Sequence, residues 1–371
     1  MTRKFSSPQQ SPAQAKTRFS LSKPHSAIAM AVATAAAAMM AIPAQAEENV
    51  LNLYSARHYQ TDEAMYAEFT KQTGIKINRV DADDAGIIAR LKAEGAASPA
   101  DVVMLVDAAR LAVANDQGLF QPIQSAKLDE AIPANLRADK GPQGVTWTGF
   151  STRARVIVYD PLRVKAEDVA TYAQLADPKL KGMLCTRTGS HPYNLSLFAT
   201  VIEQMGDQKG EAWLKGLVDN MARSPKGGDT DQIRGVASGE CGVAITNSYY
   251  AARLVASSKP EDRAVMEKVR VVFPNQGTTG THVNIAGAGV AKHAKHKEAA
   301  VAFMEYLASP FAQEYFANGN NEFPAAKGMK LDNPALKAIG GDNFKAETVP
   351  LGVVAKNMTK VQQMLDRVGY K

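Results

Sequence analysis

The chain contains few of the residues from which most enzyme and zinc sites are built. Its 371 residues include two cysteines, six histidines and two tryptophans. The patterns G-x-S-x-G, H-E-x-x-H and C-x-x-C are missing, as is a phosphate-binding loop, which argues against the hydrolases, zinc peptidases, dithiol centres and nucleotide sites that they mark. Gly287-Ala288-Gly289 is half of a dinucleotide-binding motif without its helix context, so we give it no functional role.

Long apolar runs are also scarce, and the one that is present lies near the N-terminus. Five basic residues and no acidic ones precede the run Ala27–Ile42, which is rich in Ala and Met, and Pro43–Ala46 ends in an A-x-A pattern. This arrangement is typical of a cleaved secretory signal peptide and is too short and too Ala-rich for a membrane span. We expect residues 1–46 to be removed and the remaining 325 residues to be soluble outside the cytoplasm.

A strong excess of positive charge disappears with the signal peptide. The whole chain has 43 basic and 37 acidic residues, but residues 1–46 hold five of the basic ones, so the mature part has 38 against 37. A net charge of +1 gives no electrostatic reason to expect a nucleic-acid partner.

Both cysteines lie beyond the predicted cleavage site. An even number of cysteines in an oxidising compartment favours a disulfide. A bridge between Cys185 and Cys241 would close a loop over 56 positions and would stabilise the fold by roughly 4 kcal/mol in the chain-entropy treatment. Two separate buried thiols are the alternative.

Strands and helices alternate after the signal peptide. The pattern predicts strands at 50–54, 75–80 and 101–106 and helices at 62–73, 85–94 and 108–117. This order favours an α/β lobe with a largely parallel sheet. A second series follows, with strands at 155–159, 182–185 and 242–246 and a helix around 195–205. Sheet structure returns at 283–290, and helices are expected at 297–307, 310–318 and 353–368.

These segments divide into two lobes and predict an α/β fold. We assign 47–148 and about 283–345 to an N-terminal lobe, 149–282 to a C-terminal lobe, and 346–371 to a C-terminal helix that could belong to either. Two α/β lobes behind a signal peptide indicate a bilobed periplasmic solute-binding protein of type II, in which a hinge closes the lobes over a ligand in the cleft between them. The architecture alone does not choose the ligand.

Polar aromatic residues follow three of the predicted strands. The stretches are SARHYQTD (55–62), SHPYNLS (190–196) and NSYYAARL (247–254). The carboxyl ends of strands are the usual ligand edge of such sheets. Closing lobes would therefore bring together five donor groups, which are His58, Tyr59, Tyr193, Tyr249 and Tyr250.

The adjacent pair Tyr249-Tyr250 favours a metal site. Helix neighbours point about 100° apart, so at most one of the two rings can be an ordinary core ring. Asn247 or Ser248 is expected to cap the helix, whose N-terminus favours negative charge. A phenol normally ionises near pH 10, but a highly charged cation lowers that cost. Ferric iron suits phenolates, whereas zinc prefers Cys and His and calcium prefers carboxylates.

The charge of such a site would need balancing. Four phenolates around Fe³⁺ carry a net charge of −1, and Arg253 and Arg57 could offset it. Taken singly, Tyr59 or Tyr193 is more often a half-buried packing ring than a ligand, and the pair alone could be one core ring and one surface ring, so the spacing leaves both interpretations open.

Over essentially the whole mature chain, the sequence resembles the periplasmic ferric-iron-binding proteins of bacterial ABC importers, and in particular the tyrosine-rich branch that includes the cyanobacterial Fut iron-binding proteins. The resemblance rests on LYSARHYQTDEAMYAEFTKQTGIKI, EGAASPADVVMLVDAARL, GLFQPIQS, TRARVIVYD, QLADPKLKG, GGDTDQI, NSYYAARL and FPNQGTTGTHVNIAGAGV. It implies a periplasmic monomer without a reaction step that passes Fe³⁺ to an inner-membrane ABC permease.

The resemblance also implies roles for individual residues. In that branch iron is held by tyrosines that match Tyr59, Tyr193, Tyr249 and Tyr250. His58 matches a histidine that coordinates iron in some members only. Arg253 matches an arginine near the metal, Arg153 or Arg155 approaches from the other lobe, and a synergistic anion is not expected.

Two rival functions remain at this point. The same scaffold could carry a small organic solute, such as a polyamine, thiamine or an organic acid, with the tyrosines stacking or hydrogen-bonding to it. A secreted enzyme with a tyrosine-ligated iron centre would need an open coordination position and a turnover, which nothing in the sequence indicates.

Overall fold

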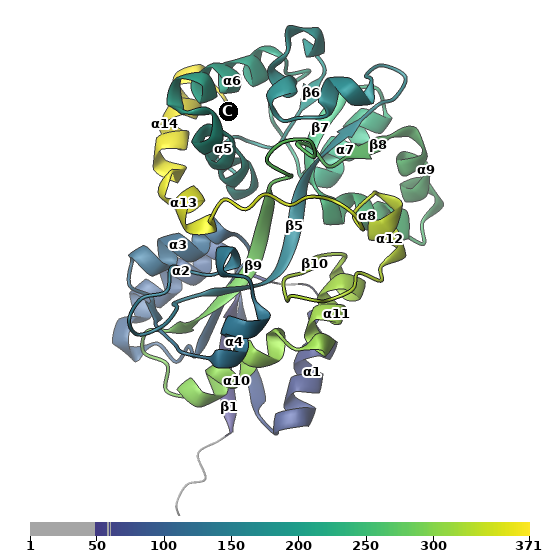
Figure 1. Ribbon diagram of the computed structural model, residues 1–371. Coiled ribbons are helices and arrows are strands. Elements are labelled where there is room, and N and C mark those ends of the chain that lie inside the picture. Colours follow the sequence, from purple (N-terminus) through teal and green to yellow (C-terminus); the bar gives the residue numbers. More distant parts are fainter. Residues whose placement is uncertain (1–48, 58, 60) are drawn as a thin grey trace, which may run out of the picture. The chain divides into compact units, whose positions relative to one another are not determined.

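The computed structural model describes residues 49–57, 59 and 61–371 (Figure 1). The predicted signal peptide and His58 lie outside the described residues, so the structure does not test them. In the part of the chain that it does describe, no helix combines the length and the apolar character needed to cross a membrane.

The first half of the chain alternates as predicted. Its elements are β1 (Val50–Ser55), α1 (Asp62–Thr73), β2 (Lys76–Asp81), α2 (Asp84–Glu94), β3 (Val102–Leu105), α3 (Ala108–Asp116), the short β4 (Phe120–Gln121) and α4 (Ala126–Ala131). β2, β1 and β3 are parallel neighbours in that order. Helix ends follow local chemistry: Gly74 takes a φ of 73° where α1 stops, and the Asp83 carboxylate caps α2 by accepting the N–H of Gly86.

Two long strands, β5 (Thr148–Tyr159) and β9 (Val283–Ala291), run side by side and antiparallel through the middle of the ribbon (Figure 1). β9 also pairs antiparallel with β3, so the sheet is parallel only in part, unlike the largely parallel sheet expected. The glycines near Ala288 serve this packing: a Cβ on Gly287 would lie 2.7 Å from the carbonyl oxygen of Thr148, and one on Gly289 would lie 2.5 Å from that of Thr146.

The second half continues the same sheet. Its elements are β6 (Leu184–Cys185), α5 (Pro192–Met205), α6 (Asp207–Asp219), α7 (Asp229–Ala237), β7 (Val243–Asn247), α8 (Ser248–Ala256), α9 (Pro260–Lys268) and β8 (Arg270–Val272). β7 lies antiparallel to β5 and parallel to β6. The main path of the sheet is therefore β2-β1-β3-β9-β5-β7-β6.

The C-terminal part is helical. Its elements are α10 (Lys297–Leu307), α11 (Pro310–Asn320), β10 (Phe323–Pro324), α12 (Pro334–Ala338), α13 (Leu351–Lys356) and α14 (Met358–Val368). The prediction of one helix over 353–368 is wrong. The chain forms two helices that meet at Asn357, which is the C-cap of α13 and the N-cap of α14.

Three apolar clusters form the core. The first core surrounds β1, β3 and the start of β5, and includes Phe150 and Ile285. The second core includes Ile157, α5 and α6, and the third includes Val156, Val283 and both cysteines. β5 and β9 thus contribute to more than one core. The lobe boundaries drawn from the sequence stay a prediction.

Cys185 and Cys241 form a disulfide, with their Cα atoms 5.9 Å apart. Cys185 ends β6, and Cys241 lies two residues before β7, the parallel neighbour of β6. The bridge therefore joins the segment that leads to Tyr193 with the segment that leads to the tyrosine pair.

A buried carboxylate, Asp107, links α3 to the other half of the chain. It caps α3 by accepting the N–H of Ala109 (2.8 Å), and it also accepts from the Ser196 hydroxyl (3.0 Å) and the Asn284 amide (2.8 Å). Burial raises the pKa of the Asp107 carboxyl to about 6, although Arg153 opposes this shift. Because the pKa in the folded state exceeds the unfolded value, Asp107 contributes stability below about pH 4 that is lost as the pH rises through about 6.

Asp107→Asn should remove this pH dependence. As the pH rises from 4 to 7, the wild type should lose up to about 3 kcal/mol of its free energy of unfolding relative to the variant. Urea denaturation of both proteins at the two pH values measures the shift. A difference that stays constant with pH would contradict the assignment.

Candidate metal centre

Tyr249 and Tyr250 occupy the first turn of α8, directly after β7 ends at Asn247. Tyr249 is 1% exposed and Tyr250 is half-buried. Their ring centroids lie 4.2 Å apart with the planes tilted by 30°. The two rings therefore face the same region instead of dividing between core and surface.

Tyr193 and Tyr59 reach the same place from two other segments. The Tyr193 hydroxyl, in the first turn of α5, lies 3.3 Å from the Tyr249 hydroxyl. The Arg253 guanidinium carbon lies 4.9 Å from the centre of the Tyr59 ring, 4.8 Å from that of Tyr249 and 5.9 Å from that of Tyr250. The four tyrosines selected from the sequence thus surround one region, although they come from three stretches of chain.

The expected side-chain cap of α8 is absent. Asn247 is the N-cap residue, but its side chain accepts no helix N–H. Its Oδ1 instead accepts from Arg155 Nη1 (3.2 Å), and the Ser248 hydroxyl accepts the N–H of Ala154 (3.2 Å). Because β5 lies directly beside β7, with Arg155 opposite Asn247, the neighbouring strand takes up both oxygens.

Arginines surround the tyrosine cluster. Arg57, predicted to lie near the metal, places its guanidinium carbon 5.0 Å from the centre of the Tyr59 ring. Those of Arg153, Arg155 and Arg187 lie 5.7, 5.8 and 5.2 Å from the centre of the Tyr193 ring. Sequence analysis missed Arg187, because it lies in a loop ahead of α5 where no periodic pattern marks it.

Three buried carboxylates pair with these arginines. Arg57 bonds Asp62 (3.0 Å) and Glu322 (2.8 Å), and Glu322 also lies 3.6 Å from Arg153. Asp229 lies 2.7 Å from Arg155 and 3.5 Å from Arg187. The group around the tyrosines therefore holds two more positive than negative charges, from Arg57, Arg153, Arg155, Arg187 and Arg253 against Asp62, Asp229 and Glu322.

Burial makes the phenols hard to ionise. It raises the pKa values of Tyr193 and Tyr249 well above the ordinary value, and Arg153 opposes both shifts. Burial also disfavours the charge on Arg153, yet Tyr193, Glu322 and Tyr249 raise its pKa. Without a ligand, Tyr193 and Tyr249 are therefore neutral at neutral pH, and a highly charged cation is needed to ionise them.

His191 lies two residues before Tyr193 and supports it. It is half-buried at the N-cap of α5, where Nδ1 accepts the N–H of Tyr193 (3.2 Å) and the two rings meet edge to face at 4.5 Å. Burial, together with the charge of Arg187, lowers the pKa of His191 to about 3. Its neutral ring fixes the backbone of Tyr193. Another buried histidine, His282, has its Nδ1 within hydrogen-bond distance of Thr200 and Glu347.

The donor set suits a hard, highly charged ion. Among the described residues, no group of three or more His, Cys, Asp or Glu side chains could hold a metal. Several buried donors around the tyrosines have no hydrogen-bond partner among the residues that the structure describes, namely Arg153 Nε and Nη2, Arg155 Nε, Arg187 Nε and Asn247 Nδ2. Unpaired buried donors are rare in native proteins, and this concentration fits a centre that is completed by a negatively charged assembly.

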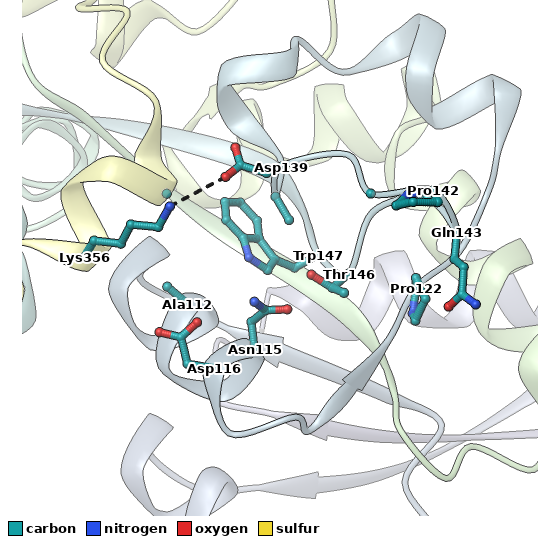
Figure 2. Close-up of a pocket in the computed structure, with 14 residues that line it drawn as sticks. Ala112, Asn115, Asp116, Pro122, Asp139, Pro142, Gln143, Thr146, Trp147 and Lys356 are labelled. Carbon is teal, nitrogen blue, oxygen red and sulfur yellow. Dashed lines mark ion pairs between the residues drawn. The ribbon is translucent and has the colours of Figure 1, made fainter.

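A separate cavity of about 410 Å³ lies between α3, the segment 138–147 and α13 (Figure 2). Trp147 and Asn115 line it, and Asp139 and Lys356 form an ion pair of 3.9 Å at its edge. None of its lining residues is a tyrosine, so this cavity is not the candidate centre.

Several known proteins that are similar to this chain are named for iron uptake or ferric-iron binding. The chain is 44% identical over 325 residues to iron uptake protein A1 of Synechocystis sp., and the aligned region covers 88% of each chain. It is 48% identical to a Trichodesmium protein solved in complex with iron and citrate, with a TM-score of 0.82 over 87% of this chain and 100% of that one. Ferric iron-binding protein A of Mannheimia haemolytica, solved in an open conformation, is 37% identical, with a TM-score of 0.78 over 87% of this chain and 99% of that one.

These matches confirm the predicted fold class, an α/β solute-binding protein. They also confirm a binding role in place of a catalytic one, since the similar proteins are named for uptake and binding. The family model of bacterial extracellular solute-binding proteins matches residues 64–340. The chain therefore belongs to the bacterial extracellular solute-binding protein family.

Proposed function

We propose that this chain is the extracytoplasmic ferric-iron-binding component of an ABC importer. It captures Fe³⁺ with Tyr59, Tyr193, Tyr249 and Tyr250 and delivers the ion to an inner-membrane permease. The observation that carries the proposal is the convergence of phenols from three segments, with the Tyr193 and Tyr249 hydroxyls 3.3 Å apart and Arg253 beside the other rings. The relatives named for iron uptake and ferric iron binding support it.

The buried phenols favour a trivalent ion, because burial raises the pKa values of Tyr193 and Tyr249 and an ion of higher charge lowers the cost of ionising them further. Four phenolates and one Fe³⁺ have a net charge of −1, and the surrounding arginines and carboxylates supply an excess of two positive charges. A divalent ion carries less charge and would stabilise the ionised phenols less. Iron is therefore held most tightly as Fe³⁺, and reduction or protonation of the phenolates weakens binding.

Closure of the lobes strengthens the site, because expelling water lowers the local dielectric. His58 lies outside the described residues, and its role as an additional ligand stays a prediction. Because four phenolates already exceed the charge of Fe³⁺, we expect no further anion to be required.

The proposed location is the periplasm. Residues 1–46 would direct export and be cleaved, leaving a mature chain that acts as a monomer and docks on the permease. The basic lead and the A-x-A site support this location, as does membership of an extracellular solute-binding family.

A visible spectrum tests the proposal. Purified mature protein mixed with ferric citrate should develop a phenolate-to-iron charge-transfer band, with one iron bound per chain. Zn²⁺ has a filled d shell and serves as a colourless control for non-specific metal binding. A wild-type protein that stays colourless with ferric citrate would contradict the proposal and favour a small organic solute instead.

A further inference from the structure

Asp229 is a fully buried carboxylate that contacts three parts of the centre. It is the first residue of α7 and is 0% exposed. Its Oδ2 accepts from Arg155 Nη1 and from the N–H of Asn247, each at 2.7 Å, and its Oδ1 lies 3.5 Å from Arg187 Nη1. One side chain thus holds two arginines and the start of the helix that carries the tyrosine pair.

These contacts lead directly to the phenols. Asn247 is followed after one residue by Tyr249 and Tyr250. Arg155 and Arg187 place their guanidinium carbons within 6 Å of the centre of the Tyr193 ring, at 5.8 and 5.2 Å. Any movement of the Asp229 carboxylate would therefore change the surroundings of three of the four tyrosines.

Glu322 is a second buried carboxylate that contacts two arginines beside the tyrosines, Arg57 and Arg153. Its Oε2 accepts from Arg57 Nη1 (2.8 Å) and from the Ser151 hydroxyl (2.9 Å), and its Oε1 lies 3.6 Å from Arg153 Nη1. Arg57 lies against the Tyr59 ring at 5.0 Å, and Arg153 lies against the Tyr193 ring at 5.7 Å. Glu322 thus connects the arginines that flank the remaining phenol and Tyr193.

Stability alone is a poor explanation for these two carboxylates. Transferring an ion pair from water to a protein interior has a desolvation cost that often cancels the attraction within the pair. Here the pairing is also incomplete: within the described part of the chain, Glu322 Oε1, Arg153 Nε and Nη2, Arg155 Nε and Arg187 Nε are buried without hydrogen-bond partners. The arrangement instead holds guanidinium groups at fixed distances from the phenols. The unpaired guanidinium nitrogens are then available to donate to the phenols once these are ionised.

We propose that Asp229 and Glu322 are positioning residues that hold four arginines where they stabilise the iron-bound phenolates. The inference rests on the proposed function. It differs from a simple charge effect, because removing a carboxylate charge would by itself make the region more positive and favour phenolates. If position matters, shifting the carboxylate without changing its charge weakens the centre.

The test uses variants that conserve charge. Asp229→Glu lengthens one carboxylate by a methylene, and Glu322→Asp shortens the other. Asp101→Glu is the matched control. Asp101 is also 0% exposed and hydrogen-bonded, but the partners of its side chain are Asn52, Lys295 and His296, which lie outside the tyrosine centre. For each full-length mature protein, three quantities are measured: apparent Fe³⁺ affinity in competition with citrate, the pH at which half of the iron colour is lost, and the melting temperature without iron.

We expect Asp229→Glu and Glu322→Asp to bind Fe³⁺ about 10–100-fold more weakly than the wild type, the range typical of groups that orient metal ligands. Both should lose the iron colour at a higher pH than the wild type does. Asp101→Glu should keep the wild-type affinity and pH midpoint even if it melts at a lower temperature. If Asp229→Glu does not fold, Glu322→Asp carries the test, because a shorter side chain cannot overpack the site.

The possible failures are distinguishable. A coloured wild type with variants of unchanged affinity and pH midpoint would overturn this inference alone. A control that weakens iron binding as much as the other variants do would also overturn it, since the effect would then follow from lost stability. A colourless wild type would overturn the proposed function and this inference with it.

Discussion

The combined change Tyr249→Phe and Tyr250→Phe should abolish the iron-dependent colour and lower Fe³⁺ affinity by more than about a hundredfold, beyond the effect usual for outer-sphere groups. Phenylalanine keeps both rings, which lie 4.2 Å apart, and removes only the two oxygens. Half of the proposed phenolates are then missing, and the two that remain carry less negative charge than is needed to balance Fe³⁺. Titration with ferric citrate under competition measures the affinity, and the visible spectrum measures the colour.

Tyr315→Phe is the matched control for this experiment. Tyr315 is half-buried on α11 and stacks on Phe311, with ring centroids 6.4 Å apart. The Tyr315→Phe variant should bind iron and show the charge-transfer band as the wild type does. A double variant that keeps both the wild-type affinity and an unchanged band would show that the pair does not hold the iron, and its assignment would be wrong.

The second large effect concerns the Cys185–Cys241 bridge. Replacing both cysteines with alanine should lower the free energy of unfolding by about 4 kcal/mol, because the unfolded chain is no longer restrained across a 56-residue separation. Urea denaturation of oxidised wild type and of the variant measures the difference. The bridge lies in the third core, between segments that lead to Tyr193 and to the tyrosine pair, so weaker iron binding is expected only after the fold itself loosens.

Reduced wild-type protein separates the cross-link from the loss of two sulfur atoms. It keeps both side chains and should account for most of the destabilisation if the restraint on the unfolded chain is the cause. Equal stability of the reduced and oxidised proteins would contradict this explanation and assign the effect of the alanine variant to lost packing.

Much of the secondary structure follows from local patterns. α1 and α10 have the predicted bounds because apolar spacing and end signals coincide there. β8 and β10 have three and two residues, which is too short for an alternating pattern to be recognised. No prediction was made for α6, whose Gly210 and Gly216 lower helix propensity. Tertiary packing overrides that cost, since a Cβ on Gly216 would lie 2.6 Å from the Ala176 methyl group.

Some residues of the candidate centre could likewise be predicted from local patterns, and others could not. Tyr59, Tyr193, Tyr249 and Tyr250 were identified from the sequence, because each follows a predicted strand and two of them are adjacent. Arg187, Asp229 and Glu322 were missed as members of the centre. The contact of the His191 ring with Tyr193 at the start of α5 could not be predicted either, because it depends on how the loop before α5 folds back.

The sequence by itself determined the alternation of strands and helices and the likeness to ferric-iron-binding proteins, and it predicted phenols in place of Cys and His as metal ligands. These are properties of short segments and of residue type. The tertiary structure alone decided which charges surround the phenols. Arg57 and Glu322 lie 265 positions apart, and Arg155 and Asp229 lie 74 apart. No local pattern records such a pairing, because a buried charge takes its partner from whichever distant segment the fold brings within hydrogen-bond distance.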